Sequence, residues 1–374
     1  MYRSALFLIV ALAFLASIAS AQQPSSGGPY KVLKTVKVGG EGNWDYIWAD
    51  VAGRRLYIPR RAPAAPPGAE GPAPASSVRT RLTTFNLDTL EPAGEIDGIG
   101  GNGAVVDPKS GHGFTSSKPV SMFDTKAMKL IKTIDVNPAT FQPDGILFDA
   151  FNERVYVFSH PTKDAMVIDA KDGTVLGNVD LGGVPEEGVP DGKGTVYVVM
   201  QDAQGGVAVV DAKTMKTTNH YPFGDKAGGC NGLALDNKNH VLFAACARSG
   251  VPTDTTPRMV ILSATDGKIL TTLPLAGGSD GAAFNPATME AFSSHGNGTM
   301  TIVKEKSPTS FEVEQDLKTW PSNGARTIAF DSTTGHLFTM SQERGPAPPP
   351  PPGGGRGGQG TPVPGSFTIL MISK

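Results

Sequence analysis

The feature that most constrains this chain is an internal repeat. Four stretches share a short acidic or amide residue followed by glycine, then Asp or Asn five positions on and an aromatic residue twelve positions on. They are NGAVVDPKSGHGF from Asn102, DGILFDAFNERVY from Asp144, NGLALDNKNHVLF from Asn231 and DGAAFNPATMEAF from Asp280. The stretches from Asp45 and Arg326 keep both spacings without the glycine, and the one from Glu187 is two residues shorter, which makes seven copies.

Each copy has the pattern of a propeller blade. The aromatic residue is followed by two more apolar runs, typified by LTTFNLD up to Asp88 and KTIDV at Lys132–Val136. Four strands in about 40 to 50 residues are typical of a blade, and a blade buries its faces only against neighbouring blades. The repeat therefore predicts an all-β fold, a seven-bladed β-propeller of four-stranded antiparallel blades.

The two ends of the chain are predicted to share the last blade. The unit that begins at Arg326 has only three strands before the chain stops at Lys374. KVLKTVKV at Lys31–Val38 closely repeats KLIKTIDV at Lys129–Val136, which is a fourth strand. We therefore expect the N-terminal strand to complete the C-terminal blade and close the ring.

Residues 1–21 have the pattern of a signal peptide. Arg3 precedes an apolar stretch from Ala5 to Ala16, and Ala19-Ser20-Ala21 fits a small-residue cleavage site. We expect an exported protein, periplasmic or extracellular, with residues 22–374 as one propeller domain and no membrane span after signal removal. An uncleaved membrane anchor is the alternative, although the apolar run is short for a bilayer span.

The charge of the chain gives little attraction for nucleic acid. It carries 33 basic and 35 acidic residues, a net charge of −2 that becomes −3 without Arg3. We expect no nucleic-acid partner and a monomer whose partner is an unknown protein, peptide or small-molecule ligand.

The units resemble YVTN repeats, most clearly VYVFSHPTKDAMVIDAKDGTVLGNVDL at Val155–Leu181. The whole chain after the signal is similar to the exported YncE-like seven-bladed propellers, which share their fold with lactonase-type propellers and the quinoprotein amine dehydrogenase β-chain. The resemblance implies a fold and leaves the activity open, because propellers host many unrelated functions.

Propeller topology predicts two rings of residues on one face of the tunnel. Residues that begin the first strands form the inner ring: Asp45, Asn102, Asp144, Glu187, Asn231, Asp280 and Arg326. Residues that close the second strands form a wider ring: Arg60, Arg61, Lys118, His160, Gln201, Arg248, His295 and Gln342. Of these, Arg61, Lys118, Gln201, Arg248, Arg326 and Gln342 are the predicted binding face.

The crowded carboxylates admit two interpretations. Asp45, Asp144, Glu187, Asn231 and Asp280 supply oxygens that suit one divalent cation of the calcium or magnesium type. CNGLAL and SDGAAF also resemble a pair in gluconolactonase/regucalcin propellers, and that likeness implies Asn231 and Asp280 as ligands, with Asp45 at the position of a first-blade Glu. Alternatively, Asp or Asn before glycine caps backbone donors as a purely structural device.

Two histidines are candidates for general-base chemistry. His160 and His295 end second strands on the carboxylate face, although a loop histidine is often inert.

Cys230 and Cys246 fall in one hairpin. If Asp236 pairs with His240, the two cysteines are directly opposite and form a disulfide, whereas a register slip of one residue separates them.

Two Pro/Gly-rich insertions, at 60–78 and 344–365, are expected on the same face.

The favoured function is a binding or scaffold module that acts through this loop-decorated tunnel face. The alternative is a divalent-metal-dependent hydrolase of the lactonase type.

Overall fold

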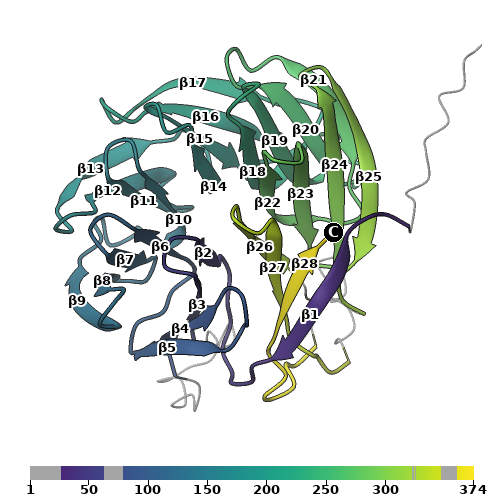
Figure 1. The fold of residues 1–374 in the computed structure, drawn as a ribbon. Helices are drawn as coiled ribbons and strands as arrows, with labels where there is room; N and C mark the ends of the chain where they lie inside the picture. The colour runs from purple at the N-terminus through teal and green to yellow at the C-terminus, as the bar shows by residue number, and fades with distance from the viewer. Residues whose placement is uncertain (1–26, 63–78, 322–323, 325, 347–359) are drawn as a thin grey trace, which may run out of the picture.

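The computed structural model describes residues 27–62, 79–321, 324, 326–346 and 360–374. These residues form seven four-stranded antiparallel sheets arranged as blades around a centre (Figure 1), which confirms the predicted all-β propeller. None of them forms an apolar helix long enough to cross a membrane. The predicted signal segment and most of both Pro/Gly-rich insertions lie outside the described residues.

The first three blades run from the inside outward in chain order. Their strands are β2 (Trp48–Asp50), β3 (Arg55–Arg60), β4 (Arg81–Asn86) and β5 (Pro92–Asp97); β6 (Ala104–Asp107), β7 (His112–Thr115), β8 (Val120–Asp124) and β9 (Lys129–Ile134); and β10 (Pro143–Asp149), β11 (Arg154–Ser159), β12 (Asp164–Asp169) and β13 (Val175–Asp180).

The next three blades repeat that order. Their strands are β14 (Pro185–Pro190), β15 (Thr195–Met200), β16 (Gly206–Asp211) and β17 (Lys216–Pro222); β18 (Gly228–Asp236), β19 (Val241–Arg248), β20 (Arg258–Ser263) and β21 (Ile269–Pro274); and β22 (Ser279–Asn285), β23 (Glu290–His295), β24 (Thr299–Ser307) and β25 (Ser310–Lys318).

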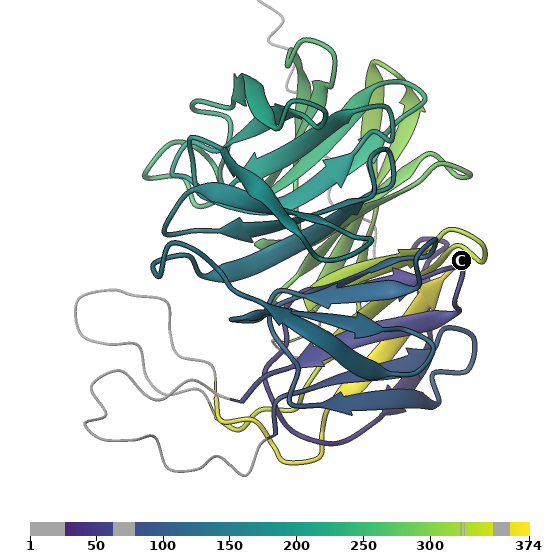
Figure 2. The same ribbon diagram turned by 90° about the vertical axis from the view of Figure 1, so that its left-hand side faces the viewer.

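The seventh blade joins both ends of the chain, as predicted. Its strands β26 (Arg326–Asp331), β27 (His336–Ser341) and β28 (Thr368–Ser373) are completed by β1 (Lys31–Lys37), which pairs antiparallel with β28 from Lys31↔Ser373 to Lys37↔Thr368. Figures 1 and 2 both show the purple strand β1 beside the yellow strand β28. The first strand of the chain therefore closes the ring by backbone pairing.

The hydrophobic core lies between neighbouring blades. The repeated aromatic residue of the second strand is buried in every blade. These residues are Tyr57, Phe114, Tyr156, Tyr197, Phe243, Phe292 and Phe338. One core cluster, for example, joins Leu56 of the first blade to Phe338 of the seventh. Apolar burial between blades accounts for the aromatic position in the repeat.

The Asp or Asn at the fifth position of the repeat forms the turn after the first strand. Asp107 Oδ1 accepts a hydrogen bond from Lys109 N at 2.9 Å, and Asp149 Oδ1 accepts one from Phe151 N at 3.0 Å. The same bond, to the backbone N two residues on, recurs at Asp236, Asn285 and Asp331. This is a side-chain-stabilised turn, so its recurrence is structural.

Candidate functional site

The inner strands change register where they reach the mouth of the tunnel. From β10 onward, each first strand has a bulge or irregularity near its start: between Pro143 and Ile146, Pro185 and Gly188, Cys230 and Gly232, Ser279 and Gly281, and Arg326 and Ala329. Bulges release residues from the pairing ladder and re-aim their side chains. The predicted inner-ring residues Asp144, Glu187, Asn231 and Asp280 lie within four of these irregular segments.

Three side chains from the third and fourth blades meet at the mouth. His160 Nε2 lies 2.8 Å from Asp144 Oδ2 and 3.4 Å from Glu186 Oε1. One potential ligand atom from each of the three residues lies within 4.8 Å of the other two. Asp144 and His160 were predicted from the sequence, whereas Glu186 was not. The geometry thus assembles an imidazole and two carboxylates, which we call the mouth cluster.

Glu186 is held by two further side chains. The Tyr46 hydroxyl donates to Glu186 Oε2, and Gln201 Nε2 donates to Glu186 Oε1. Gln201 was predicted on the binding face, and Tyr46 was missed because an aromatic residue beside a strand has the pattern of core. Its position next to Asp45 at the start of a unit was the available signal. These two hydrogen bonds fix the orientation of the carboxyl group.

The electrostatics of the mouth favour protons on the carboxyl groups. Burial, reinforced by Asp144, raises the pKa of Glu186 to about 8. Burial, with the charges of Asp280 and Asp144, raises the pKa of Asp45 to about 7. The contact with Asp144 raises the pKa of His160. A cation that enters the cluster would therefore compete with protons near neutral pH.

Two arginines border the mouth on the side of the first and seventh blades. Arg61 Nη2 lies 3.7 Å from Asp45 Oδ2. Arg326 Nη1 lies 3.9 Å from Asp280 Oδ1, and its Nη2 donates to Trp44 O at 3.3 Å. Both residues were predicted on this face. On this side of the mouth each arginine therefore lies close to an aspartate.

Several inner-ring residues bind the backbone of a neighbouring blade. Asp280 Oδ2 accepts from Thr327 N at 3.0 Å, and Asn102 Nδ2 donates to Pro143 O at 2.9 Å. Gly145 has no room for a side chain, since a Cβ there would lie 2.7 Å from Glu186 O. For these positions the capping interpretation describes the observed contacts, which link successive first strands around the tunnel.

The assignment of Glu187 to the mouth was off by one residue. Glu187 is turned inward, where its Oε2 accepts from Leu233 N at 2.7 Å and Ala282 N at 3.0 Å, and burial raises its pKa to about 8. Adjacent strand residues point to opposite sides of a sheet. Because this repeat is two residues shorter and has a bulge, the sequence alone did not determine which of the two glutamates faces the mouth. Asn231 lies half-buried in the bulge of β18, outside the mouth cluster.

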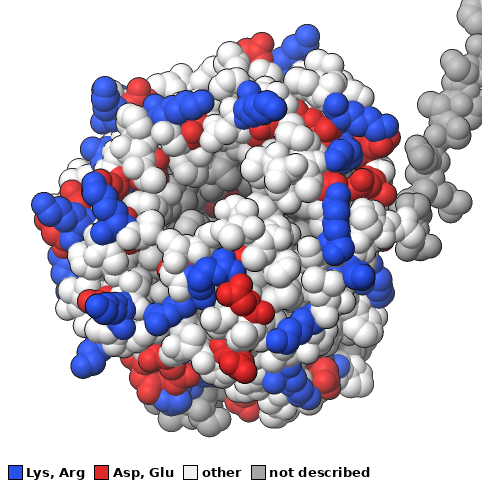
Figure 3. Space-filling model, viewed as in Figure 1, with Lys and Arg blue, Asp and Glu red and all other residues white. Residues whose placement is uncertain are grey.

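Below the mouth lies a central cavity of about 350 Å³ lined by all seven first strands. Its wall is mainly apolar and includes Trp48, Ile146, Phe284 and Ile328, with Tyr46 and Glu187 among its polar groups. Seen from the face of Figure 1, the space-filling surface has a hollow at its centre, and acidic and basic side chains are interspersed around the periphery (Figure 3). Because Tyr46 lines this cavity and its hydroxyl also donates to Glu186, it contacts both the cavity and the mouth cluster.

Four residues of the predicted wider ring lie outside the mouth cluster. Lys118 Nζ donates to Ala139 O at 2.6 Å and Phe141 O at 2.9 Å. His295 is buried, its Nδ1 is 2.9 Å from Thr299 Oγ1, and burial lowers its pKa to about 3. Gln342 is buried and Arg248 half-buried beside Gly229. His295 is therefore an uncharged interior residue at neutral pH, which removes its predicted place on the open face.

Cys230 and Cys246 form a disulfide between β18 and β19. They are direct partners in the ladder, but the predicted register at the turn was wrong by one residue because Asp236 pairs with Val241. The bulge between Cys230 and Gly232 compensates for that slip and brings the cysteines opposite each other.

The mouth cluster fits a different kind of cation from the one expected. Calcium and magnesium take oxygen ligands, whereas an imidazole with carboxylates suits zinc, manganese or a similar transition metal. Asp144, His160 and Glu186 would hold such an ion, and the bonds from Tyr46 and Gln201 would orient Glu186.

The fold recurs in solved structures, while no protein-family model and no curated protein matches this chain. A chain in the crystal structure of a mitotic checkpoint complex superposes with a TM-score of 0.63 at 10% identity, covering 90% of this chain and 95% of that chain. A chain of Kuenenia stuttgartiensis hydrazine synthase gives a TM-score of 0.62 at 14% identity, covering 79% and 91%. At these identities the likeness shows the propeller fold alone.

Proposed function

We propose that this chain is an exported, YncE-like binding module that recognises a cationic group at the mouth of its tunnel. The observation that carries the proposal is the convergence of Asp144, His160 and Glu186 at one point on the ring. The YVTN-like repeats and the signal-like N-terminus support the family and the location. The ligand is a divalent cation or the amine of a small molecule or peptide.

Proton exchange makes cation binding at this site depend on pH. Glu186 holds a proton at neutral pH because its pKa is about 8, and the pKa of His160 is raised as well. A cation replaces these protons, so binding releases protons and strengthens as the pH rises. Arg61 and Arg326, each beside an aspartate, supply hydrogen-bond donors for an anionic group on the same ligand.

A metal-dependent hydrolase is the second candidate, because the mouth cluster combines imidazole and carboxylate ligands. A bound divalent ion supplies Lewis-acid polarisation of a carbonyl. In that case Asp45, with a pKa of about 7, has the proton affinity required of a general base. The apolar cavity beneath would accept the carbon skeleton of a lactone.

Elemental analysis of protein purified without chelators tests both candidates. About one equivalent of zinc or manganese, lost in Asp144→Asn/His160→Gln and retained in Asn231→Ala, identifies the mouth cluster as a metal site, and hydrolysis of a lactone by the loaded protein then selects the enzyme. Metal-free protein should release protons in calorimetric titration with zinc or an organic diamine. If neither probe binds nor changes the melting temperature, the cationic-ligand proposal is wrong.

A further inference from the structure

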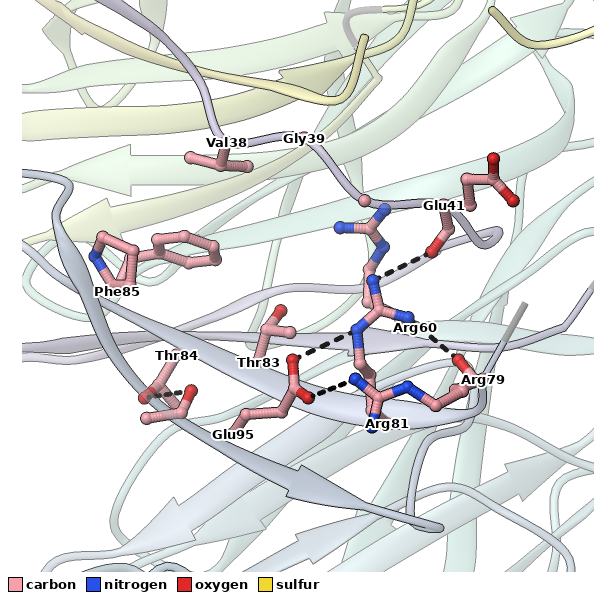
Figure 4. Close-up of a pocket in the computed structure, with 13 residues that line it drawn as sticks. Val38, Gly39, Glu41, Arg60, Arg79, Arg81, Thr83, Thr84, Phe85 and Glu95 are labelled. Atoms are coloured by element: carbon pink, nitrogen blue, oxygen red, sulfur yellow. Dashed lines mark hydrogen bonds and ion pairs between the residues drawn. The ribbon is translucent and has the colours of Figure 1, made fainter. Parts of the chain in front are cut away.

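A second site is suggested by a cavity outside the tunnel. It has a volume of about 770 Å³ and lies between the Val38–Glu41 segment and the strands β4 and β5 of the first blade. Figure 4 shows Arg60, Arg79, Arg81 and Glu95 gathered in it, with Val38 and Phe85 on its apolar side. The mouth cluster does not contribute to this lining.

Arg60 is the unusual residue of this cavity. Its side chain is only 1% exposed, and its Nε and Nη2 atoms have no hydrogen-bond partner among the described residues. Arg60 also pairs across the ladder with Arg81, so two like charges occupy opposite positions of β3 and β4. A buried charge without a partner and a like-charged neighbour both oppose folding.

The neighbouring charges are already engaged. Arg81 Nε lies 3.2 Å from Glu95 Oε2, and its other nitrogens donate to Arg79 O at 3.0 Å and Glu41 O at 3.2 Å. Arg79 lies 3.0 Å from Glu95 Oε1 and also contacts Asp97. Figure 4 draws the contacts of Arg81 and the Arg79–Glu95 pair as dashed lines. Glu95 and Asp97 are therefore paired with Arg79 and Arg81, and none of the ion pairs among the described residues includes Arg60.

The two unpartnered nitrogens form one edge of the guanidinium. Nε–H and one N–H of Nη2 point in the same direction, the arrangement that binds both oxygens of a carboxylate. The Phe367 ring covers one flat side of the group, with its centroid 3.5 Å from Arg60 Cζ, which fixes the plane. Burial and the charge of Arg81 lower the pKa of Arg60 to about 9, so it remains charged at neutral pH.

We propose that this cavity binds a small organic monocarboxylate, with the carboxylate on the Nε–Nη2 edge of Arg60 and the apolar body against Val38, Phe85 and Pro92. A monoanion matches the one arginine without a carboxylate partner, Arg60, whereas a phosphate dianion would meet Glu41 and Glu95 without a second free arginine. Gly40 lies beside both guanidinium groups, and a Cβ on it would be 2.6 Å from Arg81 Nη2 and 3.9 Å from Arg60 Nη2. Because Arg60 is only 1% exposed, access to its guanidinium edge requires the segment that contains Gly40 to shift.

Calorimetric titration of the full mature protein with benzoate, benzamide and inorganic phosphate tests the ligand class. Benzoate is expected to saturate one site, with benzamide and phosphate each binding at least about tenfold more weakly because they lack either the charge or the monoanionic form. Equal binding of benzamide, or tighter binding of phosphate, would overturn the proposal.

Substitution tests the role of Arg60. Arg60→Met should weaken benzoate binding at least about tenfold, and Arg60→Lys should also weaken it although it retains the charge, because lysine cannot form the two-donor edge. Arg258→Met, which removes a half-buried guanidinium from the fifth blade, is the matched control and should bind as the unmodified protein does. Unchanged binding in Arg60→Met refutes the site. If that variant does not fold, a crystal structure of the unmodified protein with 4-bromobenzoate decides by the position of the bromine.

Discussion

His160 Nε2 lies 2.8 Å from Asp144 Oδ2 across the start of the third blade. The pair joins the end of one strand to a bulge in its neighbour, so the local fold brings an imidazole and a carboxylate together without a long loop. The contact is the main cause of the raised pKa of His160.

Asp144→Asn should lower the pKa of His160 toward the ordinary value of about 6.5, because the neutral amide no longer favours the imidazolium. NMR titration of the histidine ring protons measures this change, and the His112 signal serves as the control. A raised folded pKa stabilises the protein below about pH 6.5, and that stability is lost as the pH rises through the folded value. The variant should therefore lose more stability at pH 5.5 than at pH 9. An unaltered His160 titration would exclude the contact in solution.

Glu186→Gln should change how stability depends on pH. The folded pKa of Glu186 is about 8 and its ordinary value is 4.5, so the folded state retains a proton that the unfolded chain releases between these values. The free energy of unfolding then falls with rising pH by up to about 1.4 kcal/mol per pH unit for this one group. Gln imitates the protonated form and should reduce the slope in urea denaturation from pH 5 to pH 8. The exposed Glu91→Gln is the control, and equal slopes in all three proteins would contradict the assignment.

Tyr30 is expected to contribute much of the attachment of the N-terminal strand. It is buried, stacks edge-on against Phe292 at 5.2 Å between centroids, and its hydroxyl donates to Glu290. Tyr30→Ala should lower the free energy of unfolding by about 3–5 kcal/mol through lost burial and an unfilled cavity. Leu33→Ala, at a side chain that is 44% exposed on β1, should change it by less than about 0.5 kcal/mol. A loss in Tyr30→Ala as small as that expected for Leu33→Ala would show that the Tyr30 side chain does not hold the strand.

Removing the disulfide should destabilise the fifth blade. Cys230 and Cys246 are 16 residues apart and fully buried, and a cross-link closing a loop of this length contributes about 3 kcal/mol in the loop-entropy account. Cys230→Ala/Cys246→Ala and the dithiothreitol-reduced protein should show comparable losses in guanidinium denaturation. If neither treatment changes the free energy of unfolding, the bond does not restrict the unfolded chain.

The fold was predictable because its signals repeat. The aromatic position recurs in every blade, the turn residue recurs in most, and the partial unit at Arg326 required the strand at Lys31–Val38. Each signal reports a local requirement, either burial between blades or a side-chain-stabilised turn. Agreement among seven copies then fixes the architecture even where one copy departs from the pattern.

The site was predictable only in part because bulges change side-chain direction. Asp144, His160 and Gln201 lie at the mouth as expected, yet Glu186 replaces Glu187 and His295 is turned into the interior. The side chains of a strand alternate, so an uncertainty of one residue exchanges the mouth for the core. Register at an irregular segment depends on contacts with the next blade, which no single repeat contains.

The bulges in five successive inner strands have a consequence for sequence divergence. A residue outside the pairing ladder can be exchanged without disturbing the strands on either side, provided that it does not also cap the next blade. Asp144 and Glu186 meet this condition better than Asp280 and Glu187, which bind neighbouring backbone. A propeller with such bulges can therefore change the side chains at its mouth one blade at a time, while the remaining blades preserve the ring.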